Sequence, residues 1–317
     1  MVGLVLCASV GVTAAPAGAG VDGIQGTESS TTKRPDFGVG RRDVTLVDTT
    51  RPTMADPSRD LPARPDRTLQ TVVLYPTRSG AQDPPRTDAR AAKGRFPLLV
   101  FSHGFTATGD LYAPFFDAMV RRGYVVALPT FPLTSGPGAN IADYVNQPGD
   151  VSFVIDELLG LSRHKGTWLS GRLRPDDVGA AGHSMGGLNT LAVTYNQCCI
   201  DSRVKAAASL AGGELPFPGG SWDDPPGTPL LLVHGVPDTS VPIGASDQVF
   251  AAATGPTSYL RLTNADHVGL FFGDDGVLTM RALLAFFDAE LNHHRKDLRV
   301  MPRIVTASGL GEWRVKH

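Results

Sequence analysis

The sequence has few cysteines and no large excess of charge of either sign. Only 3 of its 317 residues are cysteine, too few for the disulfide framework of a small secreted domain. Lysine and arginine together number 29 and aspartate and glutamate 31, which gives a formal net charge of −2. A nearly neutral chain lacks the basic footprint of a nucleic-acid-binding protein and the polybasic patch of a membrane-surface protein. We therefore predict no nucleic-acid partner.

Motifs that would indicate a metal or nucleotide site are absent from the sequence as well. It contains no HExxH, no CxxC and no GxGxxG after a strand-like run. It also has no repeat of fixed period, which excludes solenoids and propellers. We therefore predict no metal and no organic cofactor. The length permits one large α/β domain with tails, predicted over residues 39–292.

The first 20 residues carry no charged side chain, and the first lysine is Lys33. Small residues around Ala14 and Ala19 suit a signal-peptidase site, so we predict a signal peptide over 1–20 and a polar linker over 21–38. A positive N-terminal region is missing, as expected if the start lies inside a longer signal peptide. The protein is then secreted or in the cell envelope; the alternative is a disordered tail on a cytoplasmic protein. The Gly and Pro content argues against a permanent membrane span.

Two other segments leave alternatives open. Cys198 and Cys199 are adjacent, and a bond between them would close a strained small ring, so we expect two small buried thiols. An oxidising compartment would favour the bond. Residues 293–317 are polar and are expected to form a C-terminal tail that packs back on the domain or hangs free.

Strand-like and helix-like runs alternate over most of the chain. Eight strands are predicted at residues 42–47, 68–75, 96–102, 124–128, 177–182, 204–210, 229–234 and 258–262. Helical periodicity is expected after residues 110, 150, 185, 244 and 276; for example, apolar side chains recur at i, i+3, i+4 and i+7 in Tyr112, Phe115, Phe116 and Met119. This alternation predicts an α/β fold with a mainly parallel sheet and helices on both faces. The short segment from Leu210 to Pro229 leaves no room for a large cap domain.

Residues 182–186 read Gly-His-Ser-Met-Gly and join a strand-like run to a helix-like run. In that context G-x-S-x-G indicates a nucleophile elbow. The chain must turn so sharply at Ser184 that Gly182 and Gly186 have to be nearly free of side chain, and the turn presents the hydroxyl at the start of the following helix. The alternative is a Gly-rich turn with a bystander serine. We identify Ser184 as the candidate nucleophile.

An elbow of this kind is followed in chain order by an acid and then by a histidine. Asp238 follows the seventh predicted strand and His267 the eighth, so both lie where open α/β sheets form their sites. Asp238 is otherwise a turn residue in a Pro-Asp pair. Asp266 is a rival acid, but a residue adjacent to a histidine rarely reaches its ring. No other histidine has this order, loop and preceding strand.

The turn after the strand at 96–102 is the expected source of an oxyanion-binding N–H group. His103 and Gly104 begin this turn, which on its own would be a plain β-to-α connection. In combination with the elbow, the backbone N–H groups of Phe105 and Met185 are the candidate oxyanion donors.

Candidate substrate contacts come from loops at the same ends of the strands. The Pro- and Gly-rich segment 129–149 follows a strand end and should border the pocket, which makes Phe131, Leu133 and Tyr144 candidates. Loop packing is the alternative for these three residues. Leu215, after the sixth predicted strand, is a further candidate.

These motifs resemble the α/β-hydrolase superfamily over roughly residues 39–291. The runs 101–105 (Phe-Ser-His-Gly-Phe) and 182–187 (Gly-His-Ser-Met-Gly-Gly) are similar to those of the platelet-activating-factor acetylhydrolase and dienelactone-hydrolase-like group, related to bacterial cutinase-type polyester hydrolases. True dienelactone hydrolases carry Cys where Ser184 stands. Polyester hydrolases often carry a Trp after the strand that follows the nucleophile, and residues 212–217 contain none.

The resemblance implies a serine carboxylic-ester hydrolase with a Ser-Asp-His triad, an acyl-enzyme and no cofactor. Its partner would be a small-molecule or polymeric ester with a short to medium acyl group, of phospholipid or polyester type. An amidase, peptidase or thioesterase would use the same residues. A non-catalytic binding module on the same fold is a further alternative, against which the complete Ser, Asp and His set argues. The sequence predicts no particular oligomeric state.

Overall fold

The computed structural model describes residues 36–78, 80, 84–222 and 227–317. Its strands are β1 (Gly38–Asp48), β2 (Arg67–Thr77), β3 (Arg86–Thr87), β4 (Phe96–Ser102), β5 (Val125–Thr130), β6 (Leu173–His183), β7 (Val204–Leu210), β8 (Leu230–Gly235), β9 (Thr257–Leu262) and β10 (Gly311–Lys316). Its helices are α1 (Asp117–Arg121), α2 (Gln147–Arg163), α3 (Met185–Tyr195), α4 (Gly244–Ala252), α5 (Gly273–Leu291) and α6 (Lys296–Ser308). Short 3₁₀ segments are η1 (Pro57–Arg59), η2 (Gly109–Phe116), η3 (Ile141–Asn146) and η4 (Gly269–Phe271).

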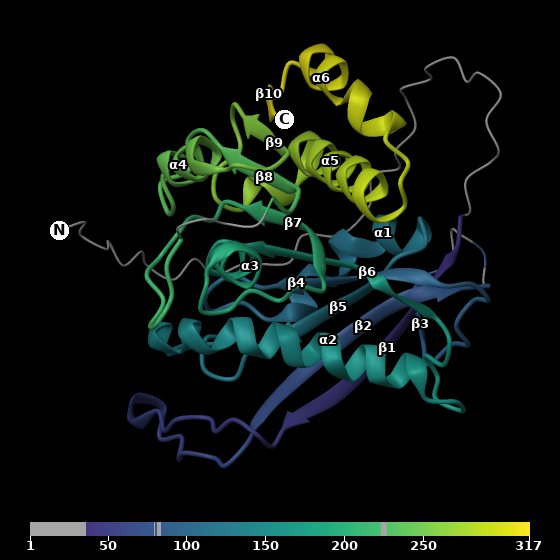
Figure 1. Cartoon of the computed structure of the whole chain (residues 1–317), viewed down its shortest axis with the longest axis vertical. Helices are drawn as coiled ribbons and strands as arrows, with labels where there is room; N and C mark the ends of the chain where they lie inside the picture. The colour runs from purple at the N-terminus through teal and green to yellow at the C-terminus, as the bar shows by residue number, and fades with distance from the viewer. Residues whose placement is uncertain (1–35, 79, 81–83, 223–226) are drawn as a thin grey trace. The chain divides into compact units, whose positions relative to one another are not determined.

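All the strands belong to one sheet in the order β10-β9-β8-β7-β6-β4-β5-β2-β1-β3 (Figure 1). Strands β5, β4, β6, β7, β8 and β9 are parallel. Strands β2 and β10 pair antiparallel with the two ends of this parallel block, and β1 pairs antiparallel with β2. A mainly parallel sheet with helices between its strands is the predicted α/β architecture.

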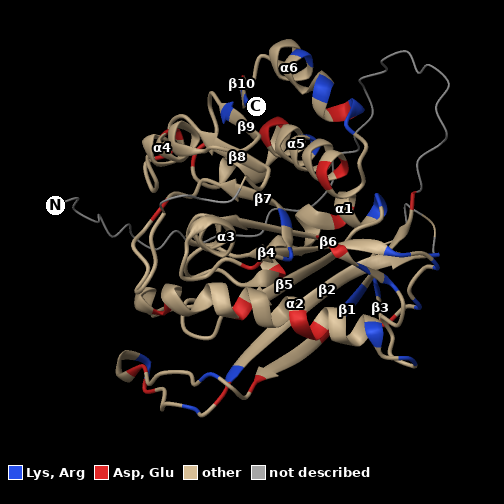
Figure 2. Cartoon of the chain, in the orientation of Figure 1, with Lys and Arg blue, Asp and Glu red and all other residues tan. Residues whose placement is uncertain are grey.

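Helices cover both faces of the sheet, and the alternation of side chains along each strand decides which helices they meet. On β4, Leu99 and Phe101 join a core with residues of α1, α5 and α6. Leu98 and Val100 join a second core with residues of α2. A strand buried on both faces needs a continuous apolar run rather than an alternating one. Consistent with this, β4 and β8 carry no charged residue, and the charged residues in Figure 2 lie mostly on helices, loops and the outer strands.

The structure contains all eight predicted strands and two more. Strand β3 is only two residues long, and β10 lies in residues 293–317, which we predicted as a tail. The segment packs back on the domain, which is one of its two predicted alternatives: β10 pairs antiparallel with β9, with Trp313 opposite Leu260. The preceding helix α6 buries Met301 and Val305 against the same core as α5.

Some predicted boundaries also differ. Tyr112, Phe115 and Phe116 lie in the 3₁₀ segment η2 rather than in an α-helix, and Pro114 within it lacks the N–H group that an α-helical turn would use. Helix α2 begins at Gln147, slightly before the predicted start. Phe37, which we placed in a linker, stacks edge-on against Phe96 with ring centroids 5.3 Å apart.

The predicted signal peptide, residues 1–20, and most of the predicted linker lie outside the described residues. Within the part of the chain that the structure describes, none of the helices is long and apolar enough to span a membrane.

Candidate active site

Four loops that carry predicted site residues meet at one edge of the sheet. Strands β4, β6, β8 and β9 are all parallel, so their carboxyl ends lie on the same side. The loops after them carry Phe105, Ser184, Asp238 and His267, respectively. In open α/β sheets this edge is where ligands bind.

Ser184 has a backbone conformation that residues other than glycine rarely adopt, with φ 56° and ψ −120°. Its two glycine neighbours make this turn possible. A Cβ atom on Gly182 would lie 2.1 Å from the carbonyl oxygen of Gly186, and one on Gly186 would lie 2.0 Å from that of Ser102. Strain of this kind is retained where the surrounding structure fixes it, typically at functional sites.

Helix α3 begins directly after the turn, at Met185. The first N–H groups of a helix have no partner within it, and the helix dipole makes this end partly positive. The carbonyl of Ser184 accepts the N–H of Leu188 at 3.0 Å, and its own N–H donates to Leu210 at 2.9 Å. The serine is therefore fixed between β7 and the start of α3.

The loop after β4 lies against the elbow. A Cβ atom on Gly104 would lie 3.4 Å from Ser184 Cβ, so this turn lies close to the serine side chain. The next residue, Phe105, is partly buried. Among the described residues, neither the Phe105 N–H nor the Met185 N–H donates a hydrogen bond to another group. Both donors are available to a ligand.

Asp238 and His267 are in direct contact, with 2.7 Å between Asp238 Oδ2 and His267 Nδ1. The other carboxylate oxygen of Asp238 accepts the N–H groups of Ser240 and Val241 at 2.8 and 2.9 Å. Burial raises the pKa of this carboxyl, but hydrogen bonds from His234, His267 and Val241 outweigh burial, and the pKa lies well below its usual range. Asp238 is therefore a buried carboxylate anion at neutral pH.

His267 turns its Nδ1 to the acid, so Nε2 is the nitrogen left for another partner. Its side chain is 18% exposed, whereas that of Asp238 is completely buried. No hydrogen bond joins the Ser184 hydroxyl to His267 within the described residues. Such contacts are often long in a site without substrate and shorten when it binds.

His234 is a member of this cluster that the sequence did not identify. Its Nε2 lies 3.2 Å from Asp238 Oδ2 and 2.9 Å from the carbonyl oxygen of Val241, and its Nδ1 lies 2.7 Å from Ser246 Oγ. Because Nε2 faces two acceptors, it carries the proton and donates it. The only signal in the sequence was the spacing of four residues between His234 and Asp238.

A solved structure shares this architecture. The ferulic acid esterase from Streptomyces cinnamoneus aligns with 85% of this chain and 94% of its own, with a TM-score of 0.63 and 22% sequence identity. The likeness shows that the chain has the α/β-hydrolase fold.

Two further comparisons match parts of this chain. The chlorophyllase family model matches residues 76–212, from the end of β2 to just beyond β7, and so includes the elbow. A bis(hydroxyethyl) terephthalate hydrolase from Streptomyces coelicolor is 29% identical over 178 residues, which are 55% of this chain and 51% of that protein. The chain thus spans about half the length of this curated relative.

Two of the predicted substrate contacts are buried. Phe131 is completely buried in the core beside α2, with its ring 4.9 Å from that of His103, and Leu133 is only 2% exposed. Neither side chain has surface to offer to a substrate. Loop packing, the alternative interpretation of these residues, describes them correctly.

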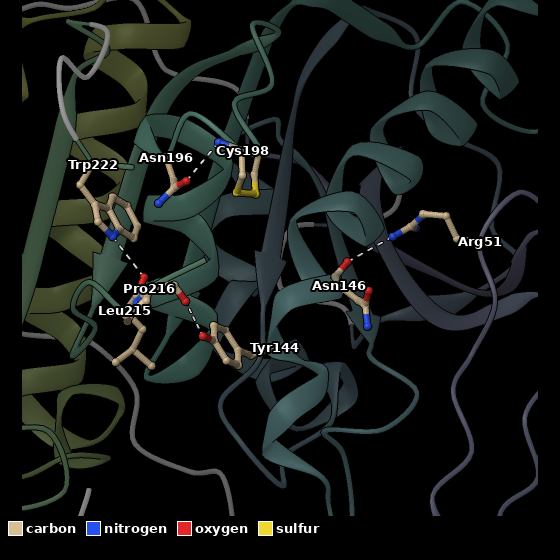
Figure 3. The surroundings of a disulfide bond; sticks show 9 residues. Arg51, Tyr144, Asn146, Asn196, Cys198, Leu215, Pro216 and Trp222 are labelled. Atoms are coloured by element: carbon tan, nitrogen blue, oxygen red, sulfur yellow. Dashed lines mark hydrogen bonds between the residues drawn. A yellow bond between two sulfur atoms is a disulfide. The ribbon is translucent and has the colours of Figure 1, made fainter. Parts of the chain in front are cut away.

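The other two predicted contacts, Tyr144 and Leu215, belong to a small cluster beside the first turn of α3. The Tyr144 hydroxyl donates to the carbonyl of Pro216, and Trp222 Nε1 donates to that of Leu215 at 3.1 Å (Figure 3). The cluster contains Leu188, Ala192 and Phe217, with Tyr144, Val145, Cys198, Cys199, Leu215 and Trp222 packed against it. Trp222 lies beyond residues 212–217, the segment in which polyester hydrolases often carry a Trp.

Cys198 and Cys199 form a disulfide at the edge of this cluster (Figure 3). The expectation of two free thiols is therefore wrong. Asn196 Oδ1 accepts the Cys198 N–H at 3.1 Å, and the Gln197 N–H donates to Ser221 at 3.0 Å. These bonds join the cysteine turn to the loop that carries Trp222.

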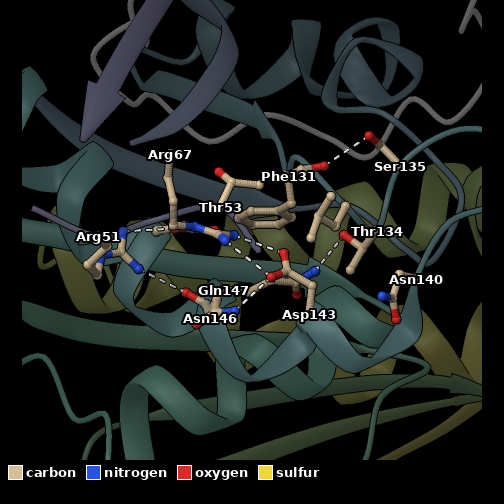
Figure 4. A network of polar contacts seen from close by, with 12 residues as sticks. Arg51, Thr53, Arg67, Phe131, Thr134, Ser135, Asn140, Asp143, Asn146 and Gln147 are labelled. Carbon is tan, nitrogen blue, oxygen red and sulfur yellow. Dashed lines mark hydrogen bonds and ion pairs between the residues drawn. The ribbon is translucent and has the colours of Figure 1, made fainter. Parts of the chain in front are cut away.

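A buried ion network holds the segment before α2 (Figure 4). The Arg67 guanidinium is completely buried and contacts the carboxylates of Asp143 and Asp150 at 2.7–3.1 Å. Arg67 is on β2, whereas the two acids are in η3 and α2, so the network fixes the segment that carries Tyr144. Gln147, at the start of α2, donates to Thr134 Oγ1 at 2.8 Å.

In residues 36–78, 80, 84–222 and 227–317, no group of three or more His, Cys, Asp or Glu side chains is arranged to hold a metal ion.

Proposed function

We propose that this protein is a serine carboxylic-ester hydrolase. The observation that carries the proposal is the strained Ser184 at the carboxyl end of β6, on the same sheet edge as the hydrogen-bonded Asp238–His267 pair. A simple strand-to-helix connection does not need a serine with positive φ between two sterically required glycines, and such strain is typical of functional sites. This conformation does expose a hydroxyl for nucleophilic attack.

In the proposed mechanism His267 acts as the general base. Its Nε2 takes the Ser184 proton as the hydroxyl attacks the ester carbonyl, and it later returns that proton to the leaving alcohol. Asp238 holds the imidazole in the tautomer with the proton on Nδ1 and stabilises the imidazolium that forms. The buried carboxylate is suited to this role because its depressed pKa keeps it charged.

The N–H groups of Phe105 and Met185 are the proposed oxyanion donors. Each has no other acceptor in the described residues, and the start of α3 adds its dipole. Removing one donor of this kind typically costs about 2.7–4 kcal/mol of transition-state stabilisation. Water activated by His267 would then hydrolyse the acyl-enzyme.

The proposed substrates are esters that reach an open site. No helix or strand lies between β7 and β8 in the described residues of that segment, 211–222 and 227–229, which argues for an uncapped site. The curated relative is named as a hydrolase of bis(hydroxyethyl) terephthalate, a small diester. We extend ester hydrolysis to this chain, with either small-molecule or polymeric esters as partners, and we propose export to the cell envelope or medium.

A p-nitrophenyl ester series from acetate to palmitate tests this proposal. The wild type should turn over at least one ester, Ser184→Ala should reduce the rate by at least about 10³-fold with unchanged circular dichroism, and a fluorophosphonate probe should label Ser184 in mass mapping. Retained turnover in Ser184→Ala would contradict the assignment. Matched amide and thioester substrates separate an amidase or thioesterase from an esterase. A folded wild type without turnover or label would indicate a binding module.

A further inference from the structure

One chain of hydrogen bonds joins the elbow to both neighbouring loops. The Gly104 N–H donates to the hydroxyl oxygen of Tyr112 at 3.3 Å. That hydroxyl lies 2.9 Å from Nδ1 of His183, the residue before the nucleophile. Nε2 of His183 lies 2.8 Å from the main-chain carbonyl oxygen of His267. The two ends of the chain are thus the loop of the proposed oxyanion donor and the loop of the proposed base.

The chemistry of the four groups fixes the direction of every bond. A carbonyl can only accept, so the proton of the neutral His183 ring is on Nε2 and is donated to His267. Nδ1 is then an acceptor, so the Tyr112 hydroxyl donates its proton to Nδ1. A main-chain N–H can only donate, so the Tyr112 oxygen also accepts from Gly104. One arrangement of protons satisfies all of these groups.

We propose that Tyr112 and His183 are positioning residues that set the oxyanion loop and the base loop relative to Ser184. The proposal rests on the function proposed above. Neither side chain needs to touch substrate: His183 is 3% exposed, and Tyr112 acts through Gly104, the residue before the proposed donor Phe105. One hydrogen bond links each catalytic loop to this pair of side chains next to the nucleophile.

Burial keeps this unit uncharged. Burial is the main cause that lowers the pKa of His183 to about 3, and it raises the pKa of Tyr112 to about 12. A charged His183 would place a second N–H against Tyr112 and break the order of donors. The groups whose charges act on His183 are His267, Asp238 and His234.

Aromatic packing holds the two rings independently of the hydrogen bonds. Tyr112 contacts Phe101 and Phe271 with ring centroids 4.7 and 5.3 Å apart. His183 contacts Phe271 at 4.9 Å and His267 at 4.7 Å. Replacing Tyr112 by phenylalanine should therefore remove the hydroxyl and leave the ring in place.

The first test compares Tyr112→Phe with Tyr75→Phe. Tyr75→Phe also removes one hydroxyl. Tyr75 is on β2, away from the elbow, and its hydroxyl donates to the Ala89 carbonyl at 2.7 Å. We expect kcat for the best ester to fall about 10- to 100-fold in Tyr112→Phe with KM within about twofold, because small misplacements of reacting groups have effects of this size. The affinity for a trifluoromethyl ketone, which forms a tetrahedral oxyanion on serine, should fall by a similar factor. Tyr75→Phe should change neither quantity.

A double-mutant cycle supplies the second measurement. His183→Phe keeps an aromatic ring and removes both the acceptor for Tyr112 and the donor to the His267 carbonyl. If the two residues act as one unit, Tyr112→Phe combined with His183→Phe should lose no more kcat than the larger single loss. Multiplied losses would contradict the coupling.

Three outcomes separate this proposal from the function on which it rests. A wild type without Ser184-dependent turnover overturns both. An active wild type with kcat and inhibitor affinity of Tyr112→Phe equal to those of Tyr75→Phe overturns the positioning proposal alone. A kcat loss in Tyr112→Phe without loss of affinity for the ketone also overturns it, because the oxyanion loop would then be unaffected.

Discussion

His234 lies behind Asp238, with its Nε2 3.2 Å from the carboxylate oxygen that also faces His267. Both side chains are completely buried. A buried carboxylate must be supplied with hydrogen-bond donors, and this one has two imidazole and two main-chain N–H donors. His234 therefore adds a buried donor to the same carboxylate oxygen that His267 contacts.

The first prediction concerns the stability that this contact contributes. His234→Phe keeps an aromatic ring but removes one donor from Asp238 and a partner from Ser246. Hydrogen bonds to charged groups contribute about 1.5–3 kcal/mol, so we expect the free energy of unfolding to fall by about that amount. Urea unfolding at pH 7 measures it. His164→Phe, at the exposed end of α2, is the matched control and should stay within about 0.5 kcal/mol of the wild type.

The second prediction separates the two candidate acids. Asp238→Asn should lower kcat about 10⁴-fold, because an amide can present N–H to His267 and stabilise the wrong tautomer. Asp266→Asn should leave kcat nearly unchanged. Asp266 is exposed, and its carboxylate accepts the N–H groups of Val268 and Gly269 rather than approaching the histidine ring. Measuring kcat for ester hydrolysis in both purified variants tests this prediction. Equal losses of kcat in the two variants would contradict the assignment of Asp238 to the proposed triad.

The third prediction concerns the elbow itself. Gly186→Ala would put a methyl group 2.0 Å from the carbonyl oxygen of Ser102, where only main-chain movement can relieve the clash. We expect destabilisation of about 4 kcal/mol or more, at the upper end of single substitutions. Gly244→Ala is the control, because a Cβ atom there meets nothing within 4 Å. Thermal unfolding of the two variants compares them; similar melting temperatures would show that the turn tolerates a side chain.

The strands and the placement of the loop residues were predictable because one physical rule governs both. Strands covered on two faces read as short apolar runs, as β4 and β8 do, and the residues after such runs lie at one sheet edge. Asp238 and His267 could therefore be placed near each other from their position after β8 and β9. The bond between them depends on side-chain geometry that periodicity does not contain.

Contacts between distant residues could not be predicted in this way. The pairing of β10 with β9 depends on α6 reversing the chain, and the polar composition of residues 293–317 concealed it. Tyr112 was predicted only as an apolar member of a helix face, although its hydroxyl contacts His183, 71 residues away in the chain. Polar contacts between segments leave no periodic pattern in either one.

The last prediction concerns the stability of the protein in acid. It starts from His103, which directly follows strand β4 and is completely buried. Its Nδ1 donates to the Gly104 carbonyl at 2.8 Å, and its Nε2 accepts the N–H of Phe131 at 3.0 Å. Only a neutral ring can do both, and burial lowers its pKa to about 4.

For His103 the folded pKa lies below the unfolded value of 6.5, so the unfolded chain binds the extra proton first as the pH falls. Its contribution to stability is complete above about pH 6.5 and is lost between there and about pH 4, at up to about 1.4 kcal/mol per pH unit. His183 adds a loss of the same sign that continues to about pH 3. Urea unfolding at pH 7, 6, 5 and 4.5 should show this decline in the wild type. His103→Gln, whose amide offers both a donor and an acceptor but does not titrate, should remove about half of the slope, and an unchanged slope would show that His103 is not a source of the acid sensitivity.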